Sequence, residues 1–247
     1  MTEVLKAYDL AGQKKCGLSV GKMLILGLFA GAFIALGGLG SQFAGTIVNK
    51  FAGAFVFPVG LMMVVLTGAE LFTGNCLLIM PVVRRAVSLP RMLLSWLIVY
   101  IGNALGGLLI ACAVYGAGVL PEEARAAAVS AYQTKCALSA PELLIRGILC
   151  NVLVCIAVYL AFAAKDVPGK ILSLFFPTML FVLCSFEHSI ANWYFLPLGS
   201  LYAGSGVLNG SMAANLCLVT LGNILGGAGI VGLGFAYAGK TAVKRDK

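Results

Sequence analysis

Long stretches without a single charged residue constrain the fold of this chain more than any other feature. The longest covers residues 188–239 and holds no Asp, Glu, Lys or Arg. A helix needs about 20 consecutive, mostly apolar residues to cross a membrane. Hydrophobic residues make up 61% of the 247 residues and charged residues 11%, whereas soluble domains contain about 25% charged residues. The sequence therefore predicts an all-α membrane protein and excludes an ordinary soluble enzyme.

The apolar stretches, together with the Gly and Pro residues that interrupt them, predict six transmembrane helices. We expect residues 1–20 to be a cytoplasmic N-terminal segment, short, amphipathic and without the cleavage site of a signal peptide. A six-span channel domain should follow over 21–238, and a cytoplasmic basic tail over 239–247. The predicted spans cover roughly 21–41, 53–83, 92–117, 142–164, 171–199 and 212–238.

The placement of basic residues predicts the orientation of the spans. With six spans, 13 of the 17 Lys and Arg residues fall on the side that carries both termini. Because cytoplasmic loops are enriched in Lys and Arg, both termini are expected in the cytoplasm of a cell whose inner (plasma) membrane holds the protein. The net charge of +8 then needs no nucleic-acid partner. The basic residues left for the outer side are Lys50, Arg125, Lys135 and Arg146, and a solvated loop is the default environment of Lys135.

The sequence contains an internal repeat. Pairs of similar segments recur in the same order at offsets of 117 to 120 residues. Since a three-span unit is odd in number, the second copy must insert upside down, which predicts an inverted repeat over about 21–120 and 141–238. The matching pairs are Gly27 with Gly147, Glu70–Asn75 with Glu187–Asn192, and Gly102–Gly107 with Gly222–Gly227.

Polar residues interrupt the second and fifth spans at matching positions, 67–76 and 184–192. Ionisable groups inside a membrane are costly and usually functional. Backbone groups freed by a helix break are tolerated only within protein or beside a wet cavity. The pattern therefore predicts broken helices two and five, which meet near the midplane of the membrane.

His188 is the single histidine of the chain. It either holds a helix break together or lines a pore, and we favour the pore because an imidazole can donate a hydrogen bond or a proton. For Glu70 and Glu187 we favour a supporting role at the helix breaks, together with Asn75 and Asn192. Thr73, at the first break, either caps the half helix or faces the substrate.

The remaining polar residues do not predict an enzyme. Most of the eight Cys lie in apolar runs, and the chain has no CxxC pair or metal-ligand spacing. With one histidine and scattered cysteines, no nucleophile, haem or metal-ligand set is recognisable. We expect no metal ion, no cofactor and no catalytic residue.

Three segments resemble the formate–nitrite transporter family: Ala69–Asn75, Arg146–Cys155 and Ser185–Asn192, which contains FEHSIAN. The segment Gly222–Ala228 is also similar, and the resemblance extends over nearly the whole chain. It implies an aquaporin-like six-helix protomer, a homopentamer in the lipid bilayer, and a pore through each protomer. It also implies that small monovalent anions such as formate, nitrite and hydrosulfide are the substrates.

The resemblance also implies roles for single residues. His188 falls on the family's central histidine, Thr73 on its threonine in the loop of span two, Lys135 on its lysine, and Asn151 is similar to its asparagine near the histidine. The family's constriction positions match Leu71 and Phe181, placed on one side of the histidine chamber, and also Phe57, Leu61 and Val154.

Formate is our first choice of substrate, with nitrite or hydrosulfide as alternatives within the family. In the expected mechanism Lys135 concentrates anions, and His188 assists passage by hydrogen bonding or by proton transfer. An aquaporin-like channel for neutral solutes is the alternative from another class, but the chain has no Asn-Pro-Ala motif.

Overall fold

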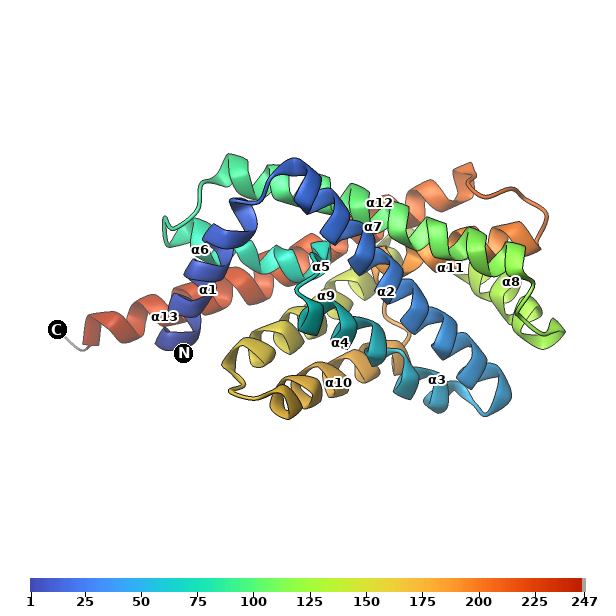
Figure 1. Cartoon of the computed structure of the whole chain (residues 1–247), viewed down its shortest axis with the longest axis horizontal. Helices are drawn as coiled ribbons and strands as arrows, with labels where there is room; N and C mark the ends of the chain where they lie inside the picture. The colour runs from blue at the N-terminus through green and yellow to red at the C-terminus, as the bar shows by residue number, and fades with distance from the viewer. Residues whose placement is uncertain (246–247) are drawn as a thin grey trace.

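The computed structural model describes residues 1–245, and every regular element in this part of the chain is a helix (Figure 1). The predicted basic tail therefore extends past the described residues at positions 246 and 247. The helices are α1 (Thr2–Cys16), α2 (Val20–Ile47), α3 (Lys50–Val56), α4 (Pro58–Thr67), α5 (Phe72–Asn75), η1 (Cys76–Leu78), α6 (Ile79–Val83), α7 (Leu89–Ala117), α8 (Glu122–Ala137), α9 (Ala140–Ala163), α10 (Val167–Leu183), α11 (Ser189–Tyr202), α12 (Gly210–Ile224), η2 (Leu225–Gly232) and α13 (Leu233–Arg245).

Within the described residues, five helical segments are long and apolar enough to cross a membrane. Two shorter apolar segments, Phe72–Val83 and Val167–Leu183, accompany them. Large side chains such as Phe29, Leu97 and Phe176 are exposed on the outside of the bundle, as expected where lipid is the solvent. The chain is a multi-pass, all-helical membrane protein. The five long segments are Val20–Ile47, Lys50–Thr67, Leu89–Ala117, Ala140–Ala163 and Met212–Gly239.

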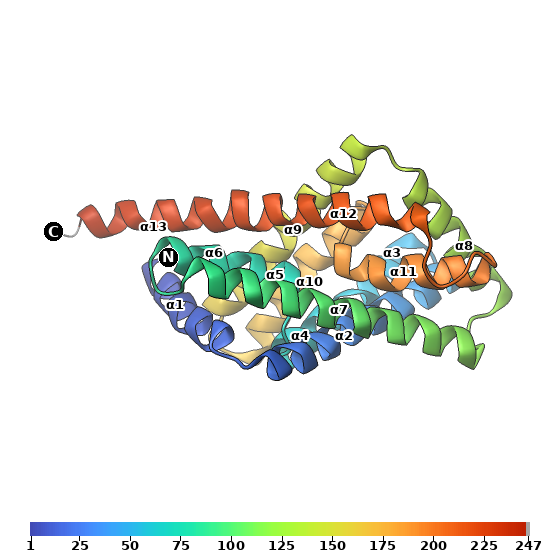
Figure 2. The ribbon, with the colours of Figure 1, turned by 90° about the horizontal axis from the view of Figure 1, so that it is seen from above.

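The default expectation that Lys135 lies in a solvated outer loop is wrong, because residues 122–137 form helix α8. Its sequence is rich in Ala and has two glutamates in its first turn, which favour a helix start. Ala124, Ala128 and Tyr132, spaced four residues apart, form its buried face, which packs against α11. Figures 1 and 2 show α1 and α8 at opposite ends of the molecule, with both chain termini at the α1 end.

Two helix pairs in the bundle cross in the same way, α2 with α7 and α9 with α12. At the first crossing a Cβ on Gly27 would lie 3.0 Å from the Val99 carbonyl oxygen, and at the second a Cβ on Gly147 would lie 2.9 Å from the Val219 carbonyl oxygen. Both crossings therefore require glycine, which explains why Gly27 and Gly147 recur at one offset in the sequence.

The helical path stops at matching places in the two halves of the chain. Helix α4 ends at Gly68, whose φ of 77° is left-handed, and α5 begins at Phe72. Helix α10 ends just before Ser185, a non-glycine residue with a left-handed φ of 56°, and α11 begins at Ser189. Gly68 and Ser185 each lie two residues before a buried glutamate.

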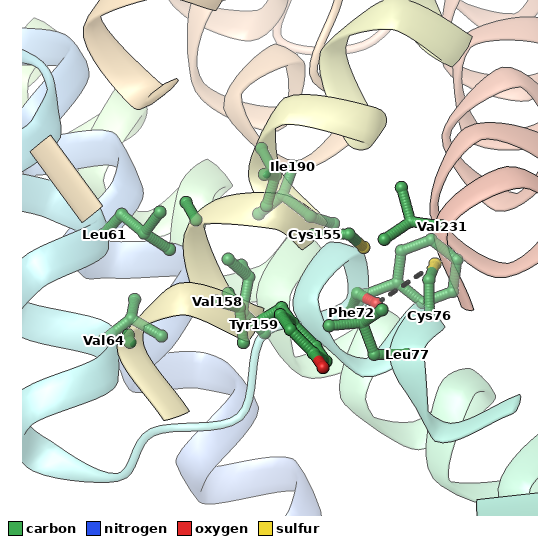
Figure 3. Packing of buried hydrophobic residues seen from close by; sticks show 14 of the residues in the cluster. Leu61, Val64, Phe72, Cys76, Leu77, Cys155, Val158, Tyr159, Ile190 and Val231 are labelled. Carbon is green, nitrogen blue, oxygen red and sulfur yellow. Dashed lines mark hydrogen bonds between the residues drawn. The ribbon is translucent and has the colours of Figure 1, made fainter. Parts of the chain in front are cut away.

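The main hydrophobic core packs around these two interruptions (Figure 3). Leu61 and Val64 of α4, Phe72 of α5, Val158 of α9 and Ile190 of α11 all belong to it. The segments on either side of each interruption are therefore held by packing as well as by hydrogen bonds.

Candidate functional site: two helix interruptions and three cavities

Asn103 on α7 fastens the first helix interruption. Its amide nitrogen donates to the carbonyl oxygens of Gly27 and Glu70, at 2.7 and 2.8 Å. Its amide oxygen accepts from the backbone N–H of Phe72, the first residue of α5, at 2.8 Å. One buried side chain thus satisfies the two backbone groups of Glu70 and Phe72 that lie at the interruption, and its bond to the Gly27 carbonyl ties them to α2.

Asn223 on α12 repeats this arrangement at the second interruption. Its amide nitrogen donates to the carbonyl oxygens of Gly147 and Glu187, at 2.8 and 3.0 Å. Its amide oxygen accepts from the backbone N–H of Ser189, the first residue of α11, at 2.9 Å. The repeated GN motif in the sequence therefore encodes a helix crossing followed by a clamp on the broken backbone.

Each interruption also carries a buried glutamate that is tied to an asparagine and a lysine. Asn192 Nδ2 lies 2.7 Å from Glu187 Oε2, and Lys135 Nζ lies 2.7 Å from Glu187 Oε1. The Lys135 side chain is 19% exposed and that of Glu187 is 4% exposed. Lys135 therefore does not lie in a solvated loop. Helix α8 positions it in an ion pair with Glu187, next to the second interruption.

Lys15 occupies the corresponding place at the other end of the molecule, and sequence analysis did not single it out. Its Nζ lies 2.9 Å from Glu70 Oε2 and 3.1 Å from Asn75 Oδ1, and Asn75 Nδ2 donates to Glu70 Oε2 at 2.8 Å. A signal was present in the sequence. Residues 13–19 read QKKCGLS and residues 133–139 read QTKCALS, at the same offset of 120.

His188 lies between the two ion pairs, at the start of α11. Its Nδ1 accepts the backbone N–H of Ala191 at 3.0 Å, as the side chain of an N-cap residue does. Nδ1 therefore carries no hydrogen, so in a neutral ring the proton is on Nε2 and is donated to Thr73 Oγ1, 2.9 Å away. The ring also stacks on Phe181, with centroids 5.7 Å apart. Both nitrogens of the imidazole are thus hydrogen-bonded within the protein.

Three cavities follow one another through this region. The Lys15 cavity, of about 370 Å³, is lined by Lys14, Lys15, Glu70, Leu61 and Leu71 among others. The central chamber, of about 10 Å³, has room for roughly one water molecule. The Lys135 cavity, of about 310 Å³, is lined by residues that include Lys135, Arg146, Glu187, Asn192 and Ser185. The central chamber is lined by Ile34, Phe57, Leu61, Val154, Thr178, Phe181 and His188.

Apolar side chains separate the three cavities. Leu61 lines both the Lys15 cavity and the central chamber. Phe57 and Phe181, whose rings meet edge to face with centroids 5.6 Å apart, line both the chamber and the Lys135 cavity. The prediction that Leu71 and Phe181 lie on one side of the chamber is wrong, because Leu71 lines the Lys15 cavity and Phe181 the Lys135 cavity. Leu71 immediately precedes α5, whereas Phe181 lies on α10, before the second interruption.

Two further predicted pathway residues lie behind the cavity walls. Asn151 is fully buried and lines none of the three cavities. It donates to the carbonyl oxygen of Asn223 at 2.6 Å and packs against Gly227, so it supports the helix of the second clamp. Thr73 is also fully buried and reaches the chamber only through His188.

The described residues contain no group of three or more His, Cys, Asp or Glu side chains arranged to hold a metal ion. Two buried thiols form hydrogen bonds to the backbone instead of binding a metal. Cys155 Sγ lies 3.4 Å from the carbonyl oxygen of Thr73, and Cys76 Sγ lies 3.5 Å from that of Phe72 (Figure 3). Both thiols act as small side chains that donate to backbone carbonyls at the first interruption.

Comparison with known proteins gives one consistent result. The sequence model of the family described as formate/nitrite transporter matches residues 2–237. The chain is 40% identical over 246 residues to the uncharacterized transporter YrhG of Bacillus subtilis, covering 94% of this chain and 90% of that protein. It is 35% identical over 253 residues to a probable formate transporter of Methanothermobacter thermautotrophicus, covering 92% of each.

Solved structures agree with the sequence relatives. An FNT family ion channel superimposes with a TM-score of 0.87 at 25% identity, covering 96% of this chain and 99% of the other. A pentameric formate channel with formate bound superimposes with a TM-score of 0.76 at 27% identity, covering 87% and 96%. Both superpositions cover most of this chain, 96% and 87% of its residues.

Proposed function

We propose that this chain, which belongs to the formate/nitrite transporter family, is a transmembrane channel for small monovalent anions, with formate as its main substrate. The single observation that carries the proposal is the series of three cavities, in which a chamber next to His188 separates two wider, cationic cavities. Relatives named as formate transporters or channels support formate as the substrate. The family consists of transporters and channels rather than enzymes.

The proposed architecture has six spans. Helices α2, α7, α9 and the continuous run from α12 to α13 are four of them, and the interrupted segments from α3 to α6 and from α10 to α11 are the other two. The matching clamps of Asn103 and Asn223 support an inverted repeat. We assign the α1 end, which carries both termini, to the cytoplasm of the inner membrane, and we propose a homopentamer by analogy with the pentameric formate channel.

Electrostatics supports an anion as the permeating species. Each wide cavity is lined by two basic side chains and one glutamate: Lys14 and Lys15 with Glu70 in one, and Lys135 and Arg146 with Glu187 in the other. The ion pairs neutralise the two carboxylates, which leaves Lys14 as the excess positive charge at the first cavity and Arg146 at the second. Arg146 also lies 3.6 Å from Glu142, an exposed carboxylate outside the cavity lining, which reduces the excess charge there. Cavities lined by an excess of one sign raise the local concentration of the opposite ion.

The central chamber is the barrier to this anion. A chamber with room for about one water molecule forces formate to lose most of its hydration shell. Formate is larger than water, so Leu61, Phe57 or Phe181 must move for it to pass. We therefore propose that the pathway is in a narrow state in this structure.

The hydrogen bonds of His188 favour one of the two mechanisms considered for it. Delivery of a proton to the anion requires a protonated ring, and a proton on Nδ1 would face the N–H of Ala191. Protonation would therefore break the cap of α11. We propose that His188 acts as a neutral, hydrogen-bonded side chain that shapes the chamber and does not transfer a proton.

The experiment is anion flux into proteoliposomes between pH 5 and 8, with formate, nitrite and hydrosulfide compared in separate runs. The matched variant is His188→Asn, because an Asn side chain can still cap α11 but cannot titrate. We expect the wild type to conduct formate fastest, and His188→Asn to conduct less while keeping the same dependence on pH. A flattened pH profile in His188→Asn would instead support proton transfer through the ring.

The alternatives have distinct outcomes in the same experiment. Faster flux of nitrite or hydrosulfide than of formate would reassign the substrate within the family. Absence of flux for all three anions, with glycerol or water permeating instead, would overturn the proposed function in favour of an aquaporin-like channel for neutral solutes.

A further inference from the structure

Thr178 contributes a hydroxyl group to the central chamber that has no partner among the residues that the structure describes. It lies on α10, is fully buried and lines the chamber together with apolar residues such as Leu61 and Val154. Its Oγ1 is buried and has no hydrogen-bond partner in the protein. An unpaired hydroxyl in a buried site is costly, so its presence calls for a reason.

Three other threonines in the helices use their hydroxyl groups differently. Thr46, Thr67 and Thr220 each donate to the carbonyl oxygen four residues earlier, at 2.8, 2.7 and 2.6 Å. This bond is the usual one for a threonine inside a helix. Thr178 does not make it, which leaves its hydroxyl free to interact with whatever occupies the chamber.

The fold itself does not need a polar residue at this place. At the offset of 117 residues that relates Glu70 to Glu187, the counterpart of Thr178 is Leu61, which lines the same chamber from α4. Leu61 is likewise buried and fills its position with an apolar side chain. A hydroxyl at position 178 is therefore a property of the pathway rather than of the helix packing.

Thr178 is better placed than His188 to bond a molecule in the chamber. Of the residues that line the chamber, only these two carry polar side-chain atoms. Both ring nitrogens of His188 are engaged, one with Ala191 and the other with Thr73. The hydroxyl of Thr178 is thus the polar side-chain group of the chamber that is available to a permeating molecule.

We propose that the Thr178 hydroxyl donates a hydrogen bond to an oxygen of the permeating anion in the central chamber, and so favours oxyanions such as formate over hydrosulfide. This inference rests on the proposed function and names a specificity-determining residue within it. An oxygen acceptor suits a hydroxyl donor, whereas sulfur is a weak acceptor. Thr178 offers the anion one polar contact at the point where water is excluded.

The test compares Thr178→Val, which keeps the shape of the side chain and removes the hydroxyl, with Thr178→Ser, which keeps the hydroxyl. Formate and hydrosulfide flux are measured for both variants and the wild type in proteoliposomes. Loss of one hydrogen bond predicts that formate flux falls about fivefold in Thr178→Val. Hydrosulfide flux should stay within about twofold of the wild type, so the ratio of the two fluxes changes. Thr178→Ser should restore the ratio.

Thermal unfolding of the purified variants separates this role from a structural one. Because the hydroxyl is unpaired in the protein, Thr178→Val should unfold at the same or a higher temperature than the wild type. An unchanged flux ratio in Thr178→Val, an equal fall for both anions, or a lower unfolding temperature would each overturn the inference. Failure of the wild type to conduct any anion would instead refute the proposed function, so the two failures are distinguishable.

Discussion

Asn103 and Asn223, 120 residues apart in the chain, make the same three hydrogen bonds at the two helix interruptions. Each donates to a glycine carbonyl on the crossing helix and to the carbonyl of a buried glutamate, and each accepts the N–H of the first residue after the break. Backbone groups freed by an interrupted helix are tolerated in an apolar environment only where the protein itself satisfies them. The side chains of Asn103 and Asn223, on the neighbouring helices α7 and α12, form these hydrogen bonds.

Replacement of one clamp should therefore be strongly destabilising. Asn223→Ala removes three buried hydrogen bonds, so we expect a loss of about 3 kcal/mol at about 1 kcal/mol for each bond. The matched control is Asn49→Ala, which removes one exposed cap to the N–H of Ala52 and should cost about 1 kcal/mol. Thermal unfolding in detergent measures both. Equal losses in the two variants would contradict the role of the clamp.

The ion pair between Lys135 and Glu187 predicts a rescue by a second substitution. Lys135→Met leaves the buried carboxylate without its partner, and we expect a loss of about 3 kcal/mol. Adding Glu187→Gln removes that uncompensated charge and should recover most of the loss. Unfolding of the single and double variants tests this, and the same cycle with Lys15 and Glu70 provides a repeat. A double variant as unstable as Lys135→Met would argue against the pair.

The left-handed backbone at Ser185 predicts a stabilising substitution. A non-glycine residue at a φ of 56° is strained, and the matching position in the first half is Gly68, at 77°. Ser185→Gly should raise stability by up to about 1 kcal/mol, reduced by loss of the exposed bond from Lys50 Nζ to Ser185 Oγ. Gly68→Ala, the opposite change, should lower stability by about 1 kcal/mol. Unfolding midpoints that move in the reverse directions would refute this.

The contact between Phe57 and Phe181 predicts a change in size selectivity. Either residue replaced by Ala should widen the passage between the central chamber and the Lys135 cavity, at a stability cost of about 3 to 5 kcal/mol. Acetate flux should rise relative to formate flux in proteoliposomes. Phe55→Ala, an exposed residue on the same stretch of helix, serves as the control and should leave the ratio unchanged. An unchanged ratio in Phe57→Ala and Phe181→Ala would place the constriction elsewhere.

Much of the architecture could be predicted because it depends on composition and on repetition. Uncharged stretches of about 20 residues indicate membrane helices whatever they pack against. The repeated Gly and Asn residues indicated two related halves before any contact was known. A solvated loop is the default environment of Lys135 in a linear reading, yet residues 122–137 form a helix with three buried positions four residues apart.

The tertiary structure alone decided how single side chains are used. Sequence placed His188 in a membrane span, but its capping of α11 and its bond to Thr73 depend on two segments 115 residues apart. The pairing of Lys15 with Glu70, the cavity on which Leu71 lies, and the free hydroxyl of Thr178 also depend on which helices meet. Hydrophobicity and repeats are properties of the amino-acid sequence and can be recognised without knowledge of the fold. Hydrogen bonds and cavity walls arise only when distant segments are brought within about 3 Å of one another.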